Sequence, residues 1–102
     1  LQGDLGMDTI YGNLHNDTIF GVGGNDSLIG GQGNDSIDGG TENDYIEGNG
    51  DRDTILGQSG NDTLIGGPSD ATDHSDTIQG GTGDDSIYGG FHHDSLYGGD
   101  NN

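Results

Sequence analysis

Aspartate recurs through this sequence at a fixed interval. Carboxylates repeated in this way are the residues of the chain best suited to bind a ligand. Ten aspartates follow one another in nine-residue steps, apart from one step of fourteen. A single aspartate would be explained as a turn residue, but ten at constant phase favour metal binding. Carboxylate oxygens suit hard divalent cations, because Ca²⁺ takes roughly six to eight oxygen ligands. The ten residues are Asp8, Asp17, Asp26, Asp35, Asp44, Asp53, Asp62, Asp76, Asp85 and Asp94.

Each aspartate belongs to a nine-residue repeat with two other fixed features. Two places after it stands Leu or Ile in all ten repeats, and the place between holds Thr or Ser nine times and Tyr45 once. Five places before it stands glycine, except in the repeat with the longer step, where Ala71 falls in that place. The longer step therefore contains a five-residue insertion.

This period predicts a coil of short strands and glycine-rich turns. The triplet of Asp, Thr or Ser, and an aliphatic residue favours a three-residue strand, and the other six residues favour a turn. Two repeats then complete one circuit, and successive circuits stack as parallel strands about 4.8 Å apart. The expected fold class is all-β, with odd repeats building one sheet and one edge of turns and even repeats building the other. The ten aliphatic side chains point inward and form the whole core.

Composition narrows the choice of partners. The 102 residues include 19 acids and one base, Arg52, for a net charge of −18. This charge excludes binding of nucleic acid or an anionic membrane through basic groups and favours a cationic partner. No apolar run is long enough to span a membrane, and the absence of cysteine excludes disulfides. Only 25% of the residues are hydrophobic, so the core is too thin to order a chain with 24 glycines without a ligand.

The repeat resembles G-G-x-G-x-D-x-U-x, the calcium-binding nonapeptide of the RTX (repeats-in-toxin) family. Two repeats fit every fixed place: GGQGNDSID at 30–38 and GGTGDDSIY at 80–88. The resemblance covers ten repeats over 3–97, and 98–102 open an eleventh turn. It implies a right-handed parallel β-roll, a two-sheet solenoid with about two repeats per coil. We expect one such block over 1–102, as a fragment of a larger secreted protein.

The resemblance also implies the metal ligands. The ten aspartates are expected to bind Ca²⁺ between turns two repeats apart, aided by backbone carbonyls of the turn residues before each Asp. Five turns on each edge leave four gaps, so up to about eight ions are expected, and their charge of about +16 nearly cancels −18. Glycines in the first and fourth places are expected at positive φ or in close approach to an ion. The glycines assigned to these sites are Gly21, Gly24, Gly30, Gly31, Gly33, Gly57, Gly60, Gly80, Gly81 and Gly83.

The fourth place of the repeat distinguishes the two edges. We expect a well-filled odd column of Ca²⁺ sites and a weaker even column. Three histidines on the even edge raise a transition-metal site as an alternative. We favour conformational substitution, because His and Asp tolerate positive φ, the circuits separate His15 from His92, and the insertion isolates His74. The fourth-place residues are Gly6, Gly24, Glu42, Gly60 and Gly83 in odd repeats and His15, Gly33, Asp51, His74 and His92 in even repeats.

Two further segments bear on partners. Residues 66–75, GGPSDATDHS, contain the insertion and the only proline, and predict an elongated turn. Its Asp70 and Asp73 either bind an ion or face water, and we favour the second. The side chains that follow the inward aliphatics should face outward, where they cover the roll against flanking domains, contact a partner, or are scattered surface apolar residues. These residues are Tyr11, Phe20, Ile29, Leu56, Ile65, Tyr88 and Tyr97.

The sequence predicts a binding module that is not itself an enzyme. It contains no H-E-x-x-H, G-x-S-x-G or P-loop motif, although a parent protein could be an enzyme or a toxin. The expected function is calcium binding, as a Ca²⁺-induced folding module of a type I-secreted protein that is extracellular or at the cell surface. The alternative is a scaffold for adhesion, surface-layer or polysaccharide interaction, with a saccharide or surface partner. The outward-facing Thr and Ser residues of the strands loosely resemble the threonine rows of ice-binding solenoids. Those proteins have two such rows, whereas the second outward-facing row is mixed in this sequence, which disfavours ice binding.

Overall fold

The chain forms a flattened coil of ten strands. The computed structural model describes residues 1–67, 74–90 and 92–100, and within them there is no helix. No described segment is thus a helix long and apolar enough to cross a membrane. The strands are β1 (Thr9–Leu14), β2 (Thr18–Gly23), β3 (Ser27–Gln32), β4 (Ser36–Thr41), β5 (Tyr45–Gly50), β6 (Thr54–Ser59), β7 (Thr63–Ile65), β8 (Thr77–Thr82), β9 (Ser86–Tyr88) and β10 (Ser95–Asp100).

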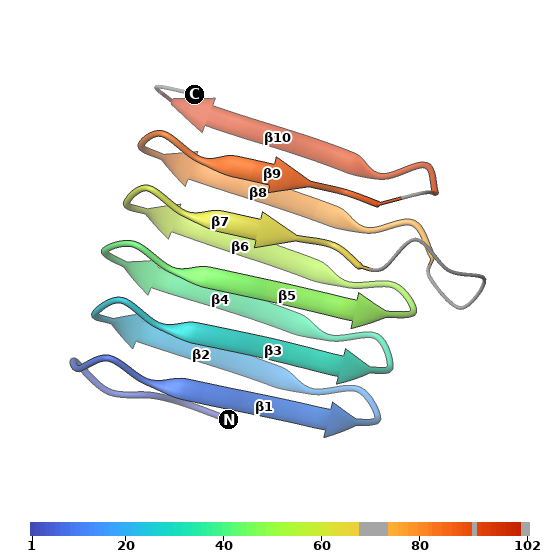
Figure 1. Ribbon diagram of the computed structural model, residues 1–102, viewed down its shortest axis with the longest axis horizontal. Coiled ribbons are helices and arrows are strands. Elements are labelled where there is room, and N and C mark those ends of the chain that lie inside the picture. The colour runs from blue at the N-terminus through green and yellow to red at the C-terminus, as the bar shows by residue number, and fades with distance from the viewer. Residues whose placement is uncertain (68–73, 91, 101–102) are drawn as a thin grey trace.

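The strands alternate between two parallel sheets. One sheet has the order β1-β3-β5-β7-β9 and the other β10-β8-β6-β4-β2. In Figure 1 the odd strands run to the right in front of the even strands, which run to the left, while the chain climbs from the N- to the C-terminus. The coil is therefore right-handed, and the expected two-sheet solenoid with two repeats per circuit is confirmed.

The register follows the sequence period. Ile10 pairs with Leu28, an offset of 18 residues, whereas Leu64 pairs with Ile87 across the insertion, an offset of 23. The place that was assigned to Ala71 is filled by Gly66, which lies against Asp76 as the other first-place glycines lie against their aspartates. The five extra residues therefore follow the first-place glycine and leave the strand register intact. Residues 68–73, with most of the expected elongated turn, lie outside the described part of the chain.

Most strands are twice as long as predicted. Eight of the ten have six residues, and only β7 and β9 have three. The prediction of six-residue turns was wrong because the residues of places two and three continue the parallel pairing, as Asn13 does with Gly31 and Leu14 with Gln32. The turn proper is thus confined to places four to six of the repeat.

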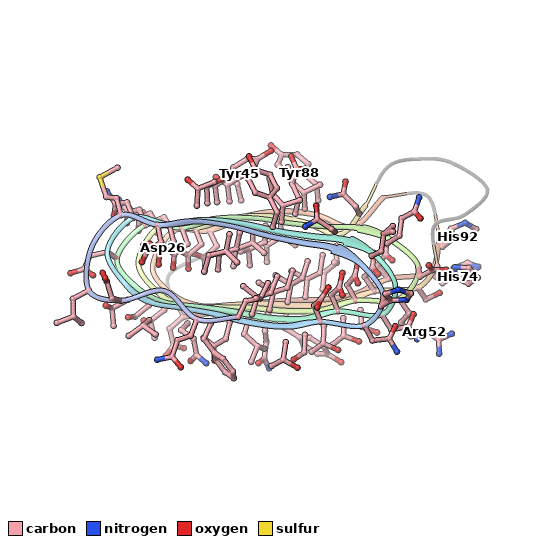
Figure 2. The ribbon with its side chains drawn as sticks, turned by 90° about the horizontal axis from the view of Figure 1, so that it is seen from below. Asp26, Tyr45, Arg52, His74, Tyr88 and His92 are labelled. Carbon is pink, nitrogen blue, oxygen red and sulfur yellow. The ribbon has the colours of Figure 1, made fainter. Side chains whose placement is uncertain are left out.

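The core is a single file of aliphatic side chains. Seven of the ten predicted residues are at most 1% exposed: Ile19, Leu28, Ile37, Ile46, Ile55, Leu64 and Ile78. Ile10 and Ile87 pack against this file, whereas Leu96 in the last circuit is 47% exposed. The aliphatic residues are not the whole core, since six of the ten repeat aspartates are buried as well, and Figure 2 shows Asp26 inside the ring of the coil.

Part of a further circuit, which the ten predicted repeats do not include, lies at the N-terminus. Residues 1–3 run beside β2, where the N–H of Gly3 donates to the carbonyl of Phe20 at 2.8 Å and the N–H of Phe20 donates to the carbonyl of Leu1 at 2.9 Å. Leu1 thereby takes the place, 18 residues before Ile19, that core residues hold in later circuits. The even sheet is extended by this rung beyond β2.

Candidate functional site

The turns at both edges use a left-handed backbone at alternate places. Positive φ occurs at the fourth place, in glycines such as Gly24 and also in His15 (79°), Glu42 (75°) and Asp51 (73°). Conformational substitution is thus confirmed for these three residues. Positive φ also occurs at the second place, for which the sequence analysis had not predicted it. The assigned glycines at positive φ are Gly24, Gly31, Gly33, Gly60, Gly81 and Gly83.

The first-place glycines serve close approach. A Cβ on Gly21 would lie 2.5 Å from Oδ2 of Asp26 and 2.4 Å from the carbonyl oxygen of Gly39 in the next circuit. Real Cβ atoms do not approach oxygens so closely, so only glycine fits. The other assigned first-place glycines, Gly30, Gly57 and Gly80, have the same neighbours in their own circuits.

The repeat aspartates form two hydrogen-bonded ladders inside the coil. The backbone N–H of every aspartate from Asp8 to Asp76 donates to Oδ1 of the aspartate one circuit later, at 2.8–2.9 Å, for example from Asp8 to Asp26 on the odd edge and from Asp17 to Asp35 on the even edge. The structure thus brings the ten predicted ligands into two columns, as the period implied. The odd column is Asp8, Asp26, Asp44, Asp62 and Asp85, and the even column is Asp17, Asp35, Asp53, Asp76 and Asp94.

The second carboxylate oxygen has no donor in several of these residues. Oδ2 is buried and accepts no hydrogen bond in Asp17, Asp26, Asp35, Asp44 and Asp62. A buried carboxylate without donors is costly unless a cation or a proton satisfies it. The structure therefore supplies oxygen atoms that require a positive partner, in a chain whose one basic side chain, Arg52, is exposed.

Burial raises the pKa of these carboxyl groups. The pKa of Asp44 rises from an ordinary 3.8 to about 7, chiefly through loss of solvent and then through the neighbouring charges of Asp62, Asp26 and Glu42, against the lowering effect of the Asp26 N–H. Burial likewise raises the pKa of Asp26, Asp35 and Asp62. The ladders thus hold carboxylates in a site that disfavours their negative charge.

Asparagines form a second pair of ladders on the outside of the turns. Asn25 Oδ1 accepts from the N–H of Asn43 at 3.0 Å, and Asn43 Oδ1 accepts from the N–H of Asn61 at 2.8 Å. On the even edge Asn16 and Asn34 accept in the same way from the next circuit. Asparagine stands immediately before five of the ten ladder aspartates, and this recurrence was the signal that could have revealed the asparagine ladders.

The two kinds of ladder divide the turn donors between them. The N–H of place five bonds to the circuit before it and the N–H of place six to the circuit after it. The carbonyl of the fourth place faces the gap between circuits, because the Gly6 oxygen lies 2.3 Å from where a Cβ on Gly24 would stand. Carbonyl and carboxylate oxygens together are the donor set that Ca²⁺ prefers, so the residues fit this ion.

Side chains alone do not build a metal site here. Among the described residues, no three His, Cys, Asp or Glu side chains are grouped closely enough to hold one ion. This arrangement follows from the register, because ladder aspartates are stacked one per circuit. Any Ca²⁺ site on these edges must therefore take much of its coordination from the backbone of the turns.

The histidines of the even edge are placed differently from the expectation. His74 is not isolated by the insertion: its Nδ1 lies 3.5 Å from Oδ1 of Asp51, and its ring stacks on that of His92 with centroids 6.4 Å apart. His74, the first described residue after the insertion, lies at the even edge beside His92 (Figure 2). His15 lies apart, beside a hollow of about 430 Å³ that Gly33 leaves open between His15 and Asp51.

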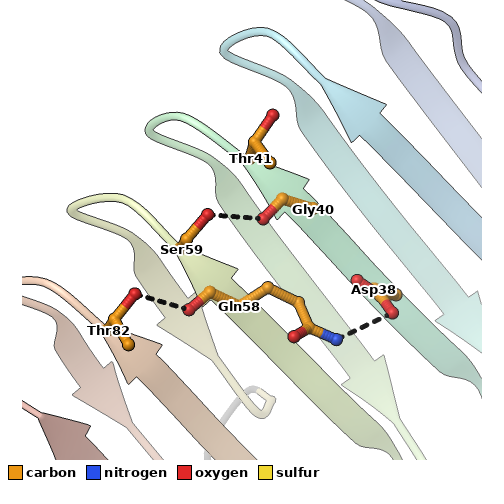
Figure 3. Close-up of a pocket in the computed structure, with 6 residues that line it drawn as sticks. All are labelled: Asp38, Gly40, Thr41, Gln58, Ser59 and Thr82. Carbon is orange, nitrogen blue, oxygen red and sulfur yellow. Dashed lines mark hydrogen bonds between the residues drawn. The ribbon is translucent and has the colours of Figure 1, made fainter.

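The outer face of the even sheet carries a shallow polar groove of about 450 Å³ (Figure 3). Its side chains bond the circuits to one another: Gln58 Nε2 donates to Asp38 at 3.0 Å, and Ser59 Oγ donates to the Gly40 carbonyl at 3.4 Å. Thr82 bonds in the same way to the carbonyl of Gln58. These polar groups are thus used to join β4, β6 and β8.

A comparison with family models agrees with the geometry of the turns. The model of the RTX calcium-binding nonapeptide repeat matches in four copies, at residues 1–28, 20–55, 38–70 and 70–102. The matched segments together span the whole chain. Comparison of the chain with curated proteins and with solved structures found no match. The chain belongs to the family of RTX calcium-binding nonapeptide repeats.

Proposed function

We propose that this chain is a folding module that becomes ordered when Ca²⁺ binds at both edges of the roll. Family membership implies calcium binding. The observation that carries the proposal is the file of buried Oδ2 atoms, such as those of Asp26, Asp44 and Asp62, that accept no hydrogen bond. Bound Ca²⁺ would supply the positive charge that these oxygens lack. Because the ladders exist only in the coiled chain, binding and folding are coupled.

The ligands that we assign are the ladder aspartates and the backbone oxygens of the turns, with the first-, second- and fourth-place glycines admitting the ion. We assign the tighter sites to the odd column. On that edge Glu42 adds a carboxylate, whose Oε2 accepts from the N–H of Gly24 at 2.8 Å, and this bond lowers the Glu42 pKa. On the even edge His15 and Asp51 stand where glycine recurs on the odd edge, and Asp51 is already engaged by His74.

Calorimetric titration tests the assignment. We expect up to about eight Ca²⁺ per chain in a tighter and a weaker class, and no comparable heat with Mg²⁺, which demands stricter geometry. Asp62→Asn should deplete the tighter class and Asp35→Asn the weaker class. A chain that takes up no Ca²⁺ at millimolar concentration, or variants that leave both classes unchanged, would contradict the proposal.

Secretion would follow from the same coupling. At cytosolic Ca²⁺ the chain would be an unfolded polyanion suited to type I export, and outside the cell Ca²⁺ would exceed site dissociation constants of about 10⁻⁴–10⁻³ M. The supporting feature is the charge of −18, which repels itself until cations bind. Fusion of the chain to a type I secretion signal tests this: raised cytosolic Ca²⁺ should slow export, and export indifferent to Ca²⁺ would count against it.

A second candidate function is binding of a neutral polysaccharide by the odd sheet. Of the residues in its five strands only Glu47 is charged, and the Tyr45 hydroxyl bonds to that carboxylate. Tyr11, Tyr45 and Tyr88 are exposed on this face, and Figure 2 shows Tyr45 and Tyr88 projecting from the same side of the coil. Aromatic rings on a flat, nearly uncharged sheet suit stacking against sugar rings. The odd strands thus contain one acid, whereas the even strands contain Asp38 and Asp100.

Pull-down with insoluble neutral polysaccharide in excess Ca²⁺ distinguishes this candidate. Tyr88→Ala combined with Tyr45→Ala should abolish retention. Tyr97→Ala, which removes an equally exposed ring from the even sheet, should not. Equal retention of all variants would show that the odd face has no such role.

A further inference from the structure

Asn49 is the one asparagine of this sequence that glycine follows. Asparagine is among the thermolabile residues of proteins, and its chemistry depends on the residue after it. Five other asparagines stand before aspartate, and Asn13 stands before Leu14. The backbone nitrogen of Gly50 is less hindered than these, because no Cβ lies beside it. Asn49 is therefore the asparagine whose side chain is most open to attack by the next residue.

This attack is a balanced reaction that needs no reagent except water. The Gly50 nitrogen forms a bond to Cγ of Asn49, and the side-chain amide nitrogen leaves as ammonia with the proton that the backbone nitrogen loses. Water then opens the cyclic imide at one of its two carbonyl groups. The products are aspartate and isoaspartate. In isoaspartate the backbone runs through the former side chain and is longer by one atom.

The folded roll holds Asn49 away from this reaction. The Asn49 N–H donates to the carbonyl of Gly66 at 2.7 Å, and Asn49 and Gly50 pair with Gly31 and Gln32 of β3. Gly50, the last residue of β5, is buried. The peptide group between Asn49 and Gly50 is thus fixed in the sheet, where it cannot rotate to bring the Gly50 nitrogen to Cγ. Attack requires local or global unfolding of this strand.

We propose that Asn49 is a deamidation site that is closed in the Ca²⁺-bound roll and open in the Ca²⁺-free chain. The dependence on Ca²⁺ rests on the proposed function. Isoaspartate at residue 49 lengthens the backbone at the end of β5, just before the turn that contains Asp53. Oδ1 of Asp53 accepts from the N–H of Asp35 at 2.9 Å, so the longer backbone disturbs the even ladder. Chain that remains without Ca²⁺ thus loses, irreversibly, part of its ability to fold.

Mass spectrometry of the incubated chain tests the proposal. The wild-type chain is kept in excess Ca²⁺, in chelator, and in chelator with urea as the unfolded reference, and isoaspartate is mapped to individual residues. We expect Asn49 to react equally fast in chelator and in urea, and more slowly by about tenfold or more in Ca²⁺. Asn13 is the internal control, because it has the same place in its repeat and a φ of 80° against 81° for Asn49. It should react far more slowly than Asn49 in every arm.

Two variants separate the reaction from its consequence. Gly50→Ala hinders the attack and should lose the modification in chelator, while the added Cβ has no neighbour nearer than 3.7 Å in the folded roll. Asn49→Asp adds the same negative charge as deamidation without lengthening the backbone. The isoaspartyl chain, isolated by chromatography, should therefore need more Ca²⁺ to fold than Asn49→Asp does, as circular dichroism measures.

Several results would overturn the proposal. These are equal modification of Asn49 in Ca²⁺ and in chelator when only the Ca²⁺ sample is folded, modification of Asn13 as fast as that of Asn49, and undiminished modification in Gly50→Ala. An isoaspartyl chain that folds at the same Ca²⁺ concentration as Asn49→Asp would remove the consequence for folding. A chain already folded in chelator would contradict the proposed function instead. Modification confined to urea would then leave the site at Asn49 and remove its dependence on Ca²⁺.

Discussion

The backbone N–H of Asp26 donates to Oδ1 of Asp44, 2.9 Å away and 18 residues further along the chain. The bond joins two circuits and fixes the Asp44 side chain inside the coil, where its Oδ2 accepts nothing. One oxygen of the carboxylate thus serves the fold, and the other is left for a cation. Repetition of this relationship along both edges makes the acidic repeat a scaffold that a divalent ion can complete.

Loss of one ladder charge should weaken the response to Ca²⁺. Asp35→Asn keeps an oxygen that can accept from the N–H of Asp17 but removes the negative charge. We expect the Ca²⁺ concentration at the folding midpoint to rise by roughly tenfold, the equivalent of about 1.4 kcal/mol. Asp84→Asn is the control, because Asp84 is exposed and precedes a ladder residue. A midpoint shift no larger than that of Asp84→Asn would contradict the assignment of Asp35 as a ligand.

Two glycines of β5 should respond oppositely to alanine. A Cβ on Gly48 would meet Asp53 Oδ2 at 2.2 Å and the Gly66 carbonyl oxygen at 2.6 Å, whereas a Cβ on Gly50 has no neighbour nearer than 3.7 Å. Gly48→Ala should destabilise the Ca²⁺-bound roll by about 1–3 kcal/mol or more. Gly50→Ala should be neutral or stabilising by up to about 1 kcal/mol, because it restricts the unfolded chain. Thermal melts in Ca²⁺ that rank the two variants the other way would exclude this packing.

The raised pKa values predict that acid can partly replace Ca²⁺. The folded chain holds protons on Asp44, Asp62 and their neighbours more tightly than the unfolded chain does. Their contribution to stability is therefore fully present below the ordinary pKa of 3.8 and is lost as pH rises through about 7, the pKa of Asp44. In chelator, circular dichroism should show more strand at about pH 5 than at about pH 7.5.

Screening of charge must be separated from protonation in that experiment. High salt at about pH 7.5 weakens repulsion without protonating the ladders, so it should restore less strand signal than acid does. A strand signal in chelator that decreases as the pH is lowered from about 7.5 to about 5, or that salt restores as fully as acid, would show that the buried carboxyl groups are not responsible.

The asparagine ladder should contribute measurably to stability. Asn43→Ala removes the oxygen that accepts from the N–H of Asn61 at 2.8 Å, and we expect a loss of about 0.5–1.5 kcal/mol in Ca²⁺. Asn43→Asp keeps an acceptor at the same place and should recover most of that loss. Urea denaturation in Ca²⁺ measures the free energy of unfolding of both variants. Equal stability of Asn43→Ala and the wild type would show that the asparagine ladder does not stabilise the fold.

The period of Asp and Leu or Ile was sufficient to predict the coil, the two sheets and the inward file of residues such as Ile46. Periodicity determines these features because an 18-residue circuit places like residues above one another. Strand length was not predictable in this way, since glycine propensity favours turns, and pairing of residues such as Asn13 with Gly31 overrides it.

The parts of the site that escaped prediction depend on three-dimensional contacts. The insertion hid Gly66 from a count of residues, because its equivalence rests on contact with Asp76 rather than on spacing. The same insertion suggested that His74 is isolated, whereas its ring stacks on that of His92. Asparagine is common in turns, so composition gave no sign that Asn25 and Asn43 bond across circuits.

The central claim is that divalent cations hold these acidic turns together. Far-ultraviolet circular dichroism of the chain, titrated with Ca²⁺ from chelator at neutral pH and compared with Mg²⁺, tests it most directly. The account predicts an unfolded spectrum in chelator, a cooperative gain of strand signal with Ca²⁺ and little gain with Mg²⁺. A full strand spectrum in chelator that Ca²⁺ does not change would contradict it.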